Sequence, residues 1–440
     1  MTFSKEIIAE VPKSAYLCRM KIAIIGAGAA GCFCAVNVKR MMRDAHVTVF
    51  AAHQKPLAKV AVTGGGRCNL TNTFANVKSL QQVYPRGHKL MKRLFHQLDQ
   101  HALMAWFEQE GVRLTVQEDQ CVFPQSQDAM EIVDTLLLGM RREEVVLRCG
   151  ERVALISEEL GGRSEELSPR YRVSTDSYSD VFDAVVITTG GSPKVTGLDF
   201  LAPLELEIEQ PVPSLFTFKI DDPITQLPGV VVEKTIATIA GTKLKAEGPL
   251  LITHHGMSGP AILKLSSQAA RHLADVGYKA QLNVNWLEGK NEDEVREELE
   301  ALLAEHPQKQ IGSVHLTTDQ QLKTGATSPL TARLWNYLIA KAGIVPERRC
   351  AEVGRKQLNK LVSILTCDTY NIIGQNRFKE EFVTCGGIAT SNIDPNTLQC
   401  RKHPGIFFAG EVLDVDAVTG GFNLQAAWTM GYVVAKELAK

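Results

Sequence analysis

Three glycines near the start of the chain have the spacing that holds the phosphates of a nucleotide. Gly26, Gly28 and Gly31 form a Gly-x-Gly-x-x-Gly motif directly after an apolar run, residues 21–25. In such a motif the first glycine permits a tight turn, the second lets a pyrophosphate approach the backbone, and the third lets the next helix pack close to the strand. Free N–H groups at the helix N-terminus attract the phosphates. The motif predicts a dinucleotide site; a glycine-rich turn of another α/β protein is the alternative.

A second glycine-rich segment near the C-terminal end indicates which dinucleotide is bound. Residues 405–411 are typical of a strand that ends in Gly410 and Glu411, and residues 419–425 open a final helix. A nicotinamide dehydrogenase closes its nucleotide site within the first fold, so this return suits the longer FAD. We expect the acid to contact ribityl hydroxyls and the helix N-terminus to face the flavin, where negative charge grows on reduction. Gly190, after a buried strand, predicts a further contact at the same sheet edge.

One expected nucleotide contact is missing from the sequence. Dinucleotide folds usually carry an acid about 20 residues after the glycines, where it binds the adenosine ribose. Here Ala51 holds that place, at the end of a predicted second strand. Ribose contact would then come from the main chain, from water, or from His53 or Gln54. Lys55 could meet the 2′-phosphate of NADP, although a solvated lysine is the simpler interpretation.

Length and composition bound the class of protein. A chain of 440 residues with 45% hydrophobic residues can form two or three domains with a sizeable core. The net charge of −1 argues against a membrane surface or a nucleic acid as a partner recruited by global charge. The ten cysteines form no Cys-x-x-Cys pair, so we predict no metal site and a reducing, cytoplasmic environment. The first 20 residues carry no signal-peptide core, and the longest uncharged run, 22–38, is too short to span a membrane.

The pattern along the chain divides it into four parts. Residues 1–19 are expected to be a disordered lead, and residues 20–204 the first part of an FAD-binding domain. Near residue 205 proline becomes frequent and β-branched runs begin, which predicts an inserted substrate domain over 205–365 with a helical subdomain over about 288–365. Residues 366–440 return to the FAD-binding domain. The predicted fold class is α/β: a Rossmann-type FAD-binding domain of the glutathione-reductase-like flavoprotein fold, with an inserted β-rich domain and a helical subdomain.

Two local patterns in the first part lead to specific expectations. Apolar residues spaced three or four apart predict a helix over 87–109. Short β-like runs at 145–149, 152–156 and 171–175, separated by glycines, predict a small meander.

Four strings resemble the BaiN-like (YhiN-type) family of NAD(P)/FAD-dependent oxidoreductases, from about residue 20 to the end. They are residues 26–31, 64–72, 253–260 and 409–426. The resemblance implies a two-dinucleotide-binding-type flavoprotein fold with an inserted β-rich domain, and flavin-dependent redox chemistry. One branch of the family is linked to reduction of carbon–carbon double bonds in oxo-bile-acid intermediates, whereas most substrates are unassigned. Ala51 departs from the family pattern, which has an acid there.

The motifs and the resemblance together predict the residues that contact the cofactor. We expect these contacts from the phosphate turn, a following loop, the second sheet edge and the start of the last helix: Gly26, Ala27, Gly28, Ala30, Gly31, Gly66, Arg67, Cys68, Asn69, Gly190, Gly410, Glu411, Asp414, Gly421, Asn423 and Gln425.

Several of these and other residues have alternative roles. Arg67 could instead form a salt bridge that fixes its loop. For Cys68, packing is favoured over a redox function because no partner cysteine lies nearby in sequence. His254 or His255 could protonate a substrate as a general acid, and a structural hydrogen bond explains either histidine equally well.

These patterns predict an FAD-dependent oxidoreductase that acts on a small organic substrate. The specific form of this prediction is reduction of a carbon–carbon double bond, with NAD(P)H as a transient electron donor. A separate nicotinamide-binding domain is not expected, because no second Gly-x-Gly-x-x-Gly occurs. One alternative is an NAD(P)-dependent dehydrogenase without flavin. Another is an RNA-related protein whose flavin is structural. A strip of basic residues supports this alternative: Arg348, Arg349, Arg355, Lys356 and Lys360. A solvated helix face also explains the same strip. Substrate, electron donor and oligomeric state are left open.

Overall fold

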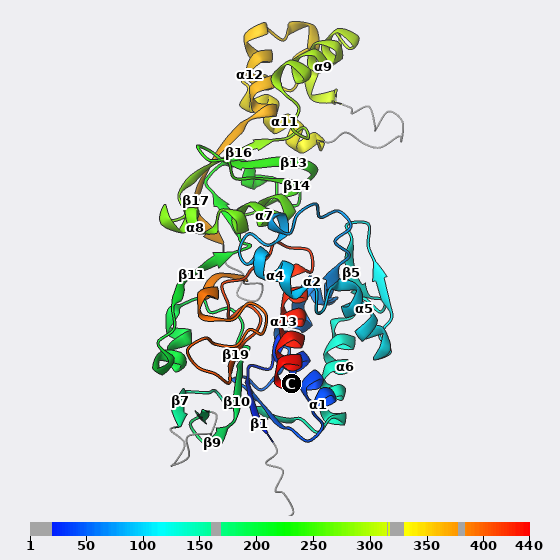
Figure 1. The fold of residues 1–440 in the computed structure, drawn as a ribbon. Helices are drawn as coiled ribbons and strands as arrows, with labels where there is room; N and C mark the ends of the chain where they lie inside the picture. The colour runs from blue at the N-terminus through cyan, green and yellow to red at the C-terminus, as the bar shows by residue number, and fades with distance from the viewer. Residues whose placement is uncertain (1–19, 160–168, 315, 317–329, 377–382) are drawn as a thin grey trace, which may run out of the picture.

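A computed structural model describes residues 20–159, 169–314, 316, 330–376 and 383–440. Figure 1 shows three parts in a row: a Rossmann domain, an inserted barrel, and a group of helices beyond the barrel. The chain enters and leaves the barrel through two strands, so the Rossmann domain contains both the first and the last described residues.

A five-stranded parallel sheet forms the centre of the Rossmann domain. Adjacent strands pair in parallel in the order β19, β10, β1, β2, β6 (Ile406–Phe408, Ala184–Ile187, Lys21–Ile25, His46–Ala51, Val146–Cys149). The middle strands are buried almost throughout, as expected for a sheet covered on both faces. Helix α1 (Ala29–Met41) packs against α13 (Phe422–Leu438), so the first and last helices lie side by side (Figure 1). The Rossmann-type α/β fold class is confirmed.

Smaller elements surround this sheet. The helices are α2 (Ala58–Gly66), α3 (Leu80–Val83), α4 (His88–Leu94), α5 (Gln100–Gln109) and α6 (Ala129–Arg142). Two three-stranded sheets accompany them: β3, β5 and β4 (Thr71–Asn72, Cys121–Pro124, Leu114–Val116), and β7, β8 and β9 (Leu155–Glu159, Arg170–Ser174, Ser179–Phe182). Short 3₁₀ helices occur along the chain as η1 to η5 (Val195–Leu204, Pro223–Gln226, Ile311–Ser313, Cys350–Glu352, Thr390–Asn392).

Two local predictions in the Rossmann domain are wrong. The helix expected over 87–109 is divided into α4 and α5, because the Asp99 carboxylate accepts a hydrogen bond from Ala102 N at 2.8 Å and starts a new helix. The meander consists of β7, β8 and β9, whereas the run near 146–149 joins the parallel sheet as β6. The sequence of a short β-like run does not indicate which strand it pairs with, because pairing depends on residues far away in sequence.

The inserted part is a closed antiparallel barrel. Its strands follow the order β12, β15, β14, β13, β16, β17 (Thr217–Ile220, Gly256–Ser258, Lys245–Thr253, Val231–Ile239, Ala280–Asn285, Asp368–Asn376). Helices α7 (Pro260–Gln268) and α8 (Ala270–Asp275) follow β15, and α7 packs on the barrel. Beyond the barrel lie α9 (Glu292–Glu305), α11 (Ala332–Lys341) and α12 (Arg355–Thr366), which share one apolar core with it (Figure 1).

An antiparallel pair of strands, β11 (Ile208–Ser214) and β18 (Val383–Ile388), connects the two parts. The barrel therefore extends from residue 217 to residue 376, so its last strand lies beyond the boundary expected at 365. The expected lead, residues 1–19, lies outside the described residues. Within the described ranges, no helix has the length and apolar character needed to cross a bilayer.

Candidate functional site

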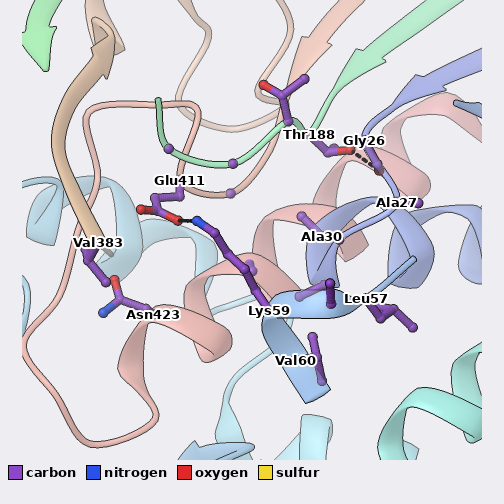
Figure 2. A pocket seen from close by; sticks show the side chains of 18 of the residues that line it. Gly26, Ala27, Ala30, Leu57, Lys59, Val60, Thr188, Val383, Glu411 and Asn423 are labelled. Atoms are coloured by element: carbon purple, nitrogen blue, oxygen red, sulfur yellow. Dashed lines mark hydrogen bonds and ion pairs between the residues drawn. The ribbon is translucent and has the colours of Figure 1, made fainter. Parts of the chain in front are cut away.

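A cavity of about 950 Å³ opens at the carboxyl edge of the parallel sheet, where ligands bind in open α/β folds. The two glycine-rich segments from opposite ends of the chain both line it, together with α2 (Figure 2). Leu215, Leu263 and Val383 close the end that faces the insert. The cavity thus runs from the phosphate turn of the Rossmann domain to the junction with the barrel.

The three glycines of the phosphate turn differ in their surroundings. Gly26 has a φ of +118°, and a Cβ there would lie 2.4 Å from Thr188 O. A Cβ on Gly31 would lie 2.0 Å from Gly26 O, so only glycine lets α1 approach β1 this closely. A Cβ on Gly28 would meet nothing within 4 Å, and Gly28 lines the cavity. The turn is therefore packed behind its first and third glycines and open at the second, as a bound pyrophosphate requires.

Helix α2 forms the wall next to this turn. Leu57, at a φ of +55°, is 2% exposed and donates from its backbone N to Ala27 O at 2.8 Å, which fixes the start of α2 beside the turn. Lys59 follows in the first turn of the helix, and its side chain extends across the cavity (Figure 2). Sequence reasoning missed Lys59, because residues 53–62 carry no motif.

Glu411 lies on the opposite wall, where sequence reasoning expected the acid for the ribityl hydroxyls. Its Oε1 accepts a hydrogen bond from Thr384 N at 2.8 Å, and its Oε2 lies 3.4 Å from Lys59 Nζ. Gly190 and Gly410, both expected contacts, line the same wall. The carboxylate is therefore anchored on one side by the backbone of β18 and faces the cavity with the other.

The start of α13 closes the cavity near the insert. Asn423 lines it and makes two hydrogen bonds with the backbone of Ala417, at 2.8 and 2.9 Å, which hold the preceding loop. With the amide of Asn69 oriented to satisfy both neighbours, Asn69 donates to Thr71 O and accepts from Gly421 N at 3.2 Å. The loop after α2 is thereby attached to the N-terminus of α13, whose dipole points toward the cavity.

Six of the predicted contact residues do not line the cavity. Gly31 supports the turn from behind, and Gly66 lies at the end of α2. Arg67 is exposed, donates to Gly64 O at 3.2 Å, and stacks its guanidinium 4.5 Å over the ring of Phe123 rather than forming a salt bridge.

The other three of the six have protein partners. Cys68 is fully buried, and burial raises the pKa of its thiol to about 12. Asp414 lies 3.6 Å from Arg271 Nη2 in the junction. Gln425 is buried on the inner face of α13, between Thr71 and Thr429. We therefore propose no direct cofactor contact for these side chains.

The adenosine end of the site offers a carboxylate that the sequence did not reveal. Ala51 ends β2 and is 5% exposed, and its O accepts a hydrogen bond from Glu151 N at 2.9 Å. Glu151 therefore lines the cavity beside the position where the expected acid is missing. Hydrogen bonds from Thr175 and Ser177 hold the pKa of Glu151 below its ordinary value, so it is ionised at neutral pH. No motif pointed to Glu151, since it lies 100 residues after Ala51 in sequence.

His254 and His255 occupy the hairpin turn between β14 and β15 of the barrel. Both side chains are exposed, and neither lines the cavity. Of the described histidines, only His53 lines it, at the adenosine end. A role for either barrel histidine as a general acid remains a prediction that needs a substrate-bound arrangement. Within the described residues, no group of three or more metal-ligating side chains is placed to hold a metal ion.

The cavity fits a dinucleotide of the size of FAD. Its volume lies at the upper end of the range of about 300–1,000 Å³ that is typical of ligand sites. Its described lining carries four cations and two carboxylates, an excess of positive charge that suits a pyrophosphate: Lys55, Lys59, Arg152 and Lys194 against Glu151 and Glu411. Open space above Gly28 provides the approach to the backbone.

Comparison with known proteins identifies the family. The model of the HI0933-like protein Rossmann domain family matches residues 20–437, so the chain belongs to this family. The chain is 26% identical to the 3-dehydro-bile acid delta(4,6)-reductase of Clostridium scindens, over 96% of this chain and 99% of that protein. It is 27% identical to the ribosomal RNA dihydrouridine synthase of Escherichia coli, over 96% of this chain and 98% of that protein. Among solved structures, the 3-ketosteroid delta1-dehydrogenase of Sterolibacterium denitrificans aligns with a TM-score of 0.48 at 11% identity, over 96% of this chain and 99% of that one.

The family assignment confirms the resemblance found in the sequence. It also confirms the class of protein, a flavin-dependent oxidoreductase, and a flavin as the cofactor. The alternative of an NAD(P)-dependent dehydrogenase without flavin is therefore ruled out.

Proposed function

We propose that this member of the HI0933-like family is an FAD-dependent reductase of a carbon–carbon double bond conjugated to a carbonyl group, with NAD(P)H as a transient electron donor. The observation that carries the proposal is the cavity, which joins the phosphate turn at Gly28 to apolar residues of the junction, Leu215, Leu263 and Val383. A cofactor that fills the Rossmann portion would present its reactive end to a substrate at the insert.

The names of the relatives support this chemistry. The name of the 3-dehydro-bile acid delta(4,6)-reductase places its double bonds at positions 4 and 6, where they are conjugated with the oxo group at position 3. A dihydrouridine synthase reduces the 5,6 double bond of uracil, which is conjugated to the C4 carbonyl. The two substrates differ greatly in size, but both contain an α,β-unsaturated carbonyl. We therefore assign the class of reacting bond to this chain and leave the rest of the substrate open.

The bound flavin would supply the hydride for the electron-poor carbon of such a bond. Four features of the chain prepare the site for this. The turn at Gly28 and the N-terminus of α1 would bind the pyrophosphate, and Glu411 would accept hydrogen bonds from ribityl hydroxyls. The N-terminus of α13 would stabilise the negative charge that grows on the flavin pyrimidine when the flavin is reduced. The apolar junction residues Leu215 and Leu263 exclude water from the reacting end.

Anaerobic stopped-flow spectroscopy tests the proposal in two half-reactions. The purified protein should show a flavin spectrum, and NADH or NADPH should bleach it. The reduced protein should then be reoxidised by a cyclic enone or by uridine, and not by a cyclic alkene of the same size that lacks the carbonyl. A dithionite-reduced protein that no conjugated carbonyl reoxidises would refute the assignment of the bond, and the absence of bleaching by both nucleotides would remove NAD(P)H as donor.

A uridine within RNA is the second candidate substrate. The dihydrouridine synthases among the relatives favour it, and so does the basic strip expected from sequence. Helix α12 carries three exposed cations, Arg355, Lys356 and Lys360, and no acidic residue. Arg349 is exposed nearby, whereas Arg348 is half-buried and donates to Gln357 Oε1 at 2.9 Å.

Charge reversal tests this candidate directly. Lys356→Glu/Lys360→Glu should weaken RNA binding and reduce its salt dependence, because each lost phosphate contact removes a released counterion. A matched control is Lys243→Glu/Lys245→Glu, which reverses two exposed lysines of the barrel. Equal RNA binding by both double variants would remove the strip as an RNA contact. RNA that binds but is never reduced would instead favour a structural flavin.

A further inference from the structure

An ion pair between Lys59 and Glu411 crosses the cavity. It occupies the space between the two walls through which the backbone of a bound dinucleotide would pass. Figure 2 shows the Lys59 side chain reaching from α2 to the opposite wall, where its Nζ lies 3.4 Å from Glu411 Oε2. Both residues line the cavity. A dinucleotide that extends from Gly28 toward the junction must pass between these walls, so its binding must move one of the two side chains.

The two partners differ in how firmly they are held. The Glu411 carboxylate is 21% exposed and is fixed by the hydrogen bond from Thr384 N. The Lys59 side chain is 61% exposed, and this ion pair is its one side-chain hydrogen bond among the described residues. An exposed lysine on a flexible stem contributes little through such a pair. Lys59 is therefore the partner that moves at small cost, whereas Glu411 stays in place.

The backbone of Lys59 is already positioned beside the expected phosphates. The hydrogen bond from Leu57 N to Ala27 O holds the first turn of α2 against the phosphate turn. Lys59 lies two residues later, so its side chain starts from the wall next to the phosphate turn. A pyrophosphate there would carry negative charge that the α1 N–H groups contact from one face only.

We infer that Lys59 exchanges partners when the cofactor binds: its ammonium leaves Glu411 and pairs with the pyrophosphate of FAD. One oxygen of Glu411 then becomes free to accept hydrogen bonds from the ribityl hydroxyls, while the other keeps Thr384 N. Before binding, the two side chains thus neutralise each other's charge inside the cavity. After binding, Lys59 contacts the pyrophosphate and Glu411 contacts the ribityl chain. This inference rests on the FAD assignment of the proposed function.

Titration of the apo-protein with FAD and with riboflavin, followed by flavin fluorescence, separates the two contacts. Riboflavin keeps the ribityl chain but lacks the pyrophosphate. Lys59→Met should weaken FAD binding by about 10- to 100-fold, the usual effect of losing a charged hydrogen bond. It should leave riboflavin binding unchanged or slightly tighter. Glu411→Gln should weaken both ligands, and Lys402→Met, which removes an exposed lysine away from the cavity, should change neither.

The salt dependence of FAD binding provides a second measurement. FAD affinity of the wild type should fall more steeply with ionic strength than that of Lys59→Met, because the variant lacks one of the charges that screening weakens. If Lys59→Met changes neither the affinity for FAD nor the dependence of that affinity on ionic strength, the proposed exchange of partners is overturned. An equal loss for FAD and riboflavin would also overturn it. A wild-type protein that binds neither ligand would contradict the FAD assignment itself, which is a different result from normal FAD binding by the variant.

Discussion

Replacement of Arg86 by methionine should destabilise the folded chain through a single buried charge. Arg86 pairs with Asp416, whose side chain is 0% exposed, and Ser214 Oγ donates to the same carboxylate at 3.0 Å. Arg86→Met leaves that carboxylate with the serine alone. Removal of one partner of a buried ion pair usually costs about 3–5 kcal/mol. We expect a loss of about 3 kcal/mol, near the lower end, because Arg86 is 15% exposed and the hydrogen bond from Ser214 remains.

The pH dependence of this loss distinguishes the charge from lost packing. Burial raises the pKa of Asp416, and the ion pair with Arg86 opposes that rise. Without Arg86 the folded-state pKa rises further, well above the unfolded value of about 4. The folded variant then keeps a proton that the unfolded chain has released, so stability falls as pH rises from the unfolded pKa to the folded pKa. Above the folded pKa the loss is constant.

Urea unfolding of the apo-protein at pH 5 and pH 8, followed by near-UV circular dichroism, measures the effect. The difference in unfolding free energy between wild type and Arg86→Met should be larger at pH 8 than at pH 5. Addition of Asp416→Asn to the variant should restore part of the stability at pH 8. Arg93→Met on α4, which removes an exposed arginine bonded to Asn396, is the matched control and should change stability by less than about 0.5 kcal/mol. A difference that is independent of pH would refute the reasoning.

Two further predictions concern the walls of the cavity. Gly28→Ala should leave the melting temperature of the apo-protein nearly unchanged and lower its FAD content, whereas Gly31→Ala should lower both, since its Cβ would lie 2.0 Å from Gly26 O; equal melting temperatures of the two variants would contradict the packing argument. Among the described cysteines, Cys367 should react first with a thiol reagent at pH 8, because it is exposed. Cys68 should stay unlabelled because burial raises its pKa to about 12; rapid labelling at Cys68, identified by mass spectrometry, would show that the loop opens.

The parts of the site that could be predicted are those whose chemistry is contiguous in sequence. The phosphate turn is one segment, so residue type and spacing alone indicated that Gly28 would face the ligand and Gly31 would pack against the strand. Glu411 was found in the same way, directly after a strand that ends at the sheet edge. The identity of the strand partners was less accessible, because β6 and β19 join the sheet through residues far from β1 in sequence.

The residues that were missed depend on the arrangement of the elements. Lys59 lies in a segment without a motif, and its approach to Glu411 depends on the direction of α2, which is set by the left-handed backbone of Leu57 just before the helix. Glu151 reaches the end of β2 from the loop that follows the neighbouring strand β6. Conversely, a motif indicates residue types but not their direction: Gln425 follows Asn423 by two residues, which is about 200° around a helix, so the two side chains point to opposite sides of α13.

The loop that carries Glu411 also holds the insert in place. The strand that leads into the barrel, β11, ends at Ser214, which donates to Asp416. The strand that leads out, β18, donates from Thr384 N to Glu411. Both connections therefore end on one loop, five residues apart, and that loop forms a wall of the cavity. Since displacement of the insert as a whole would break a buried hydrogen bond to Asp416, the position of the barrel and the geometry of the cofactor wall must be set together.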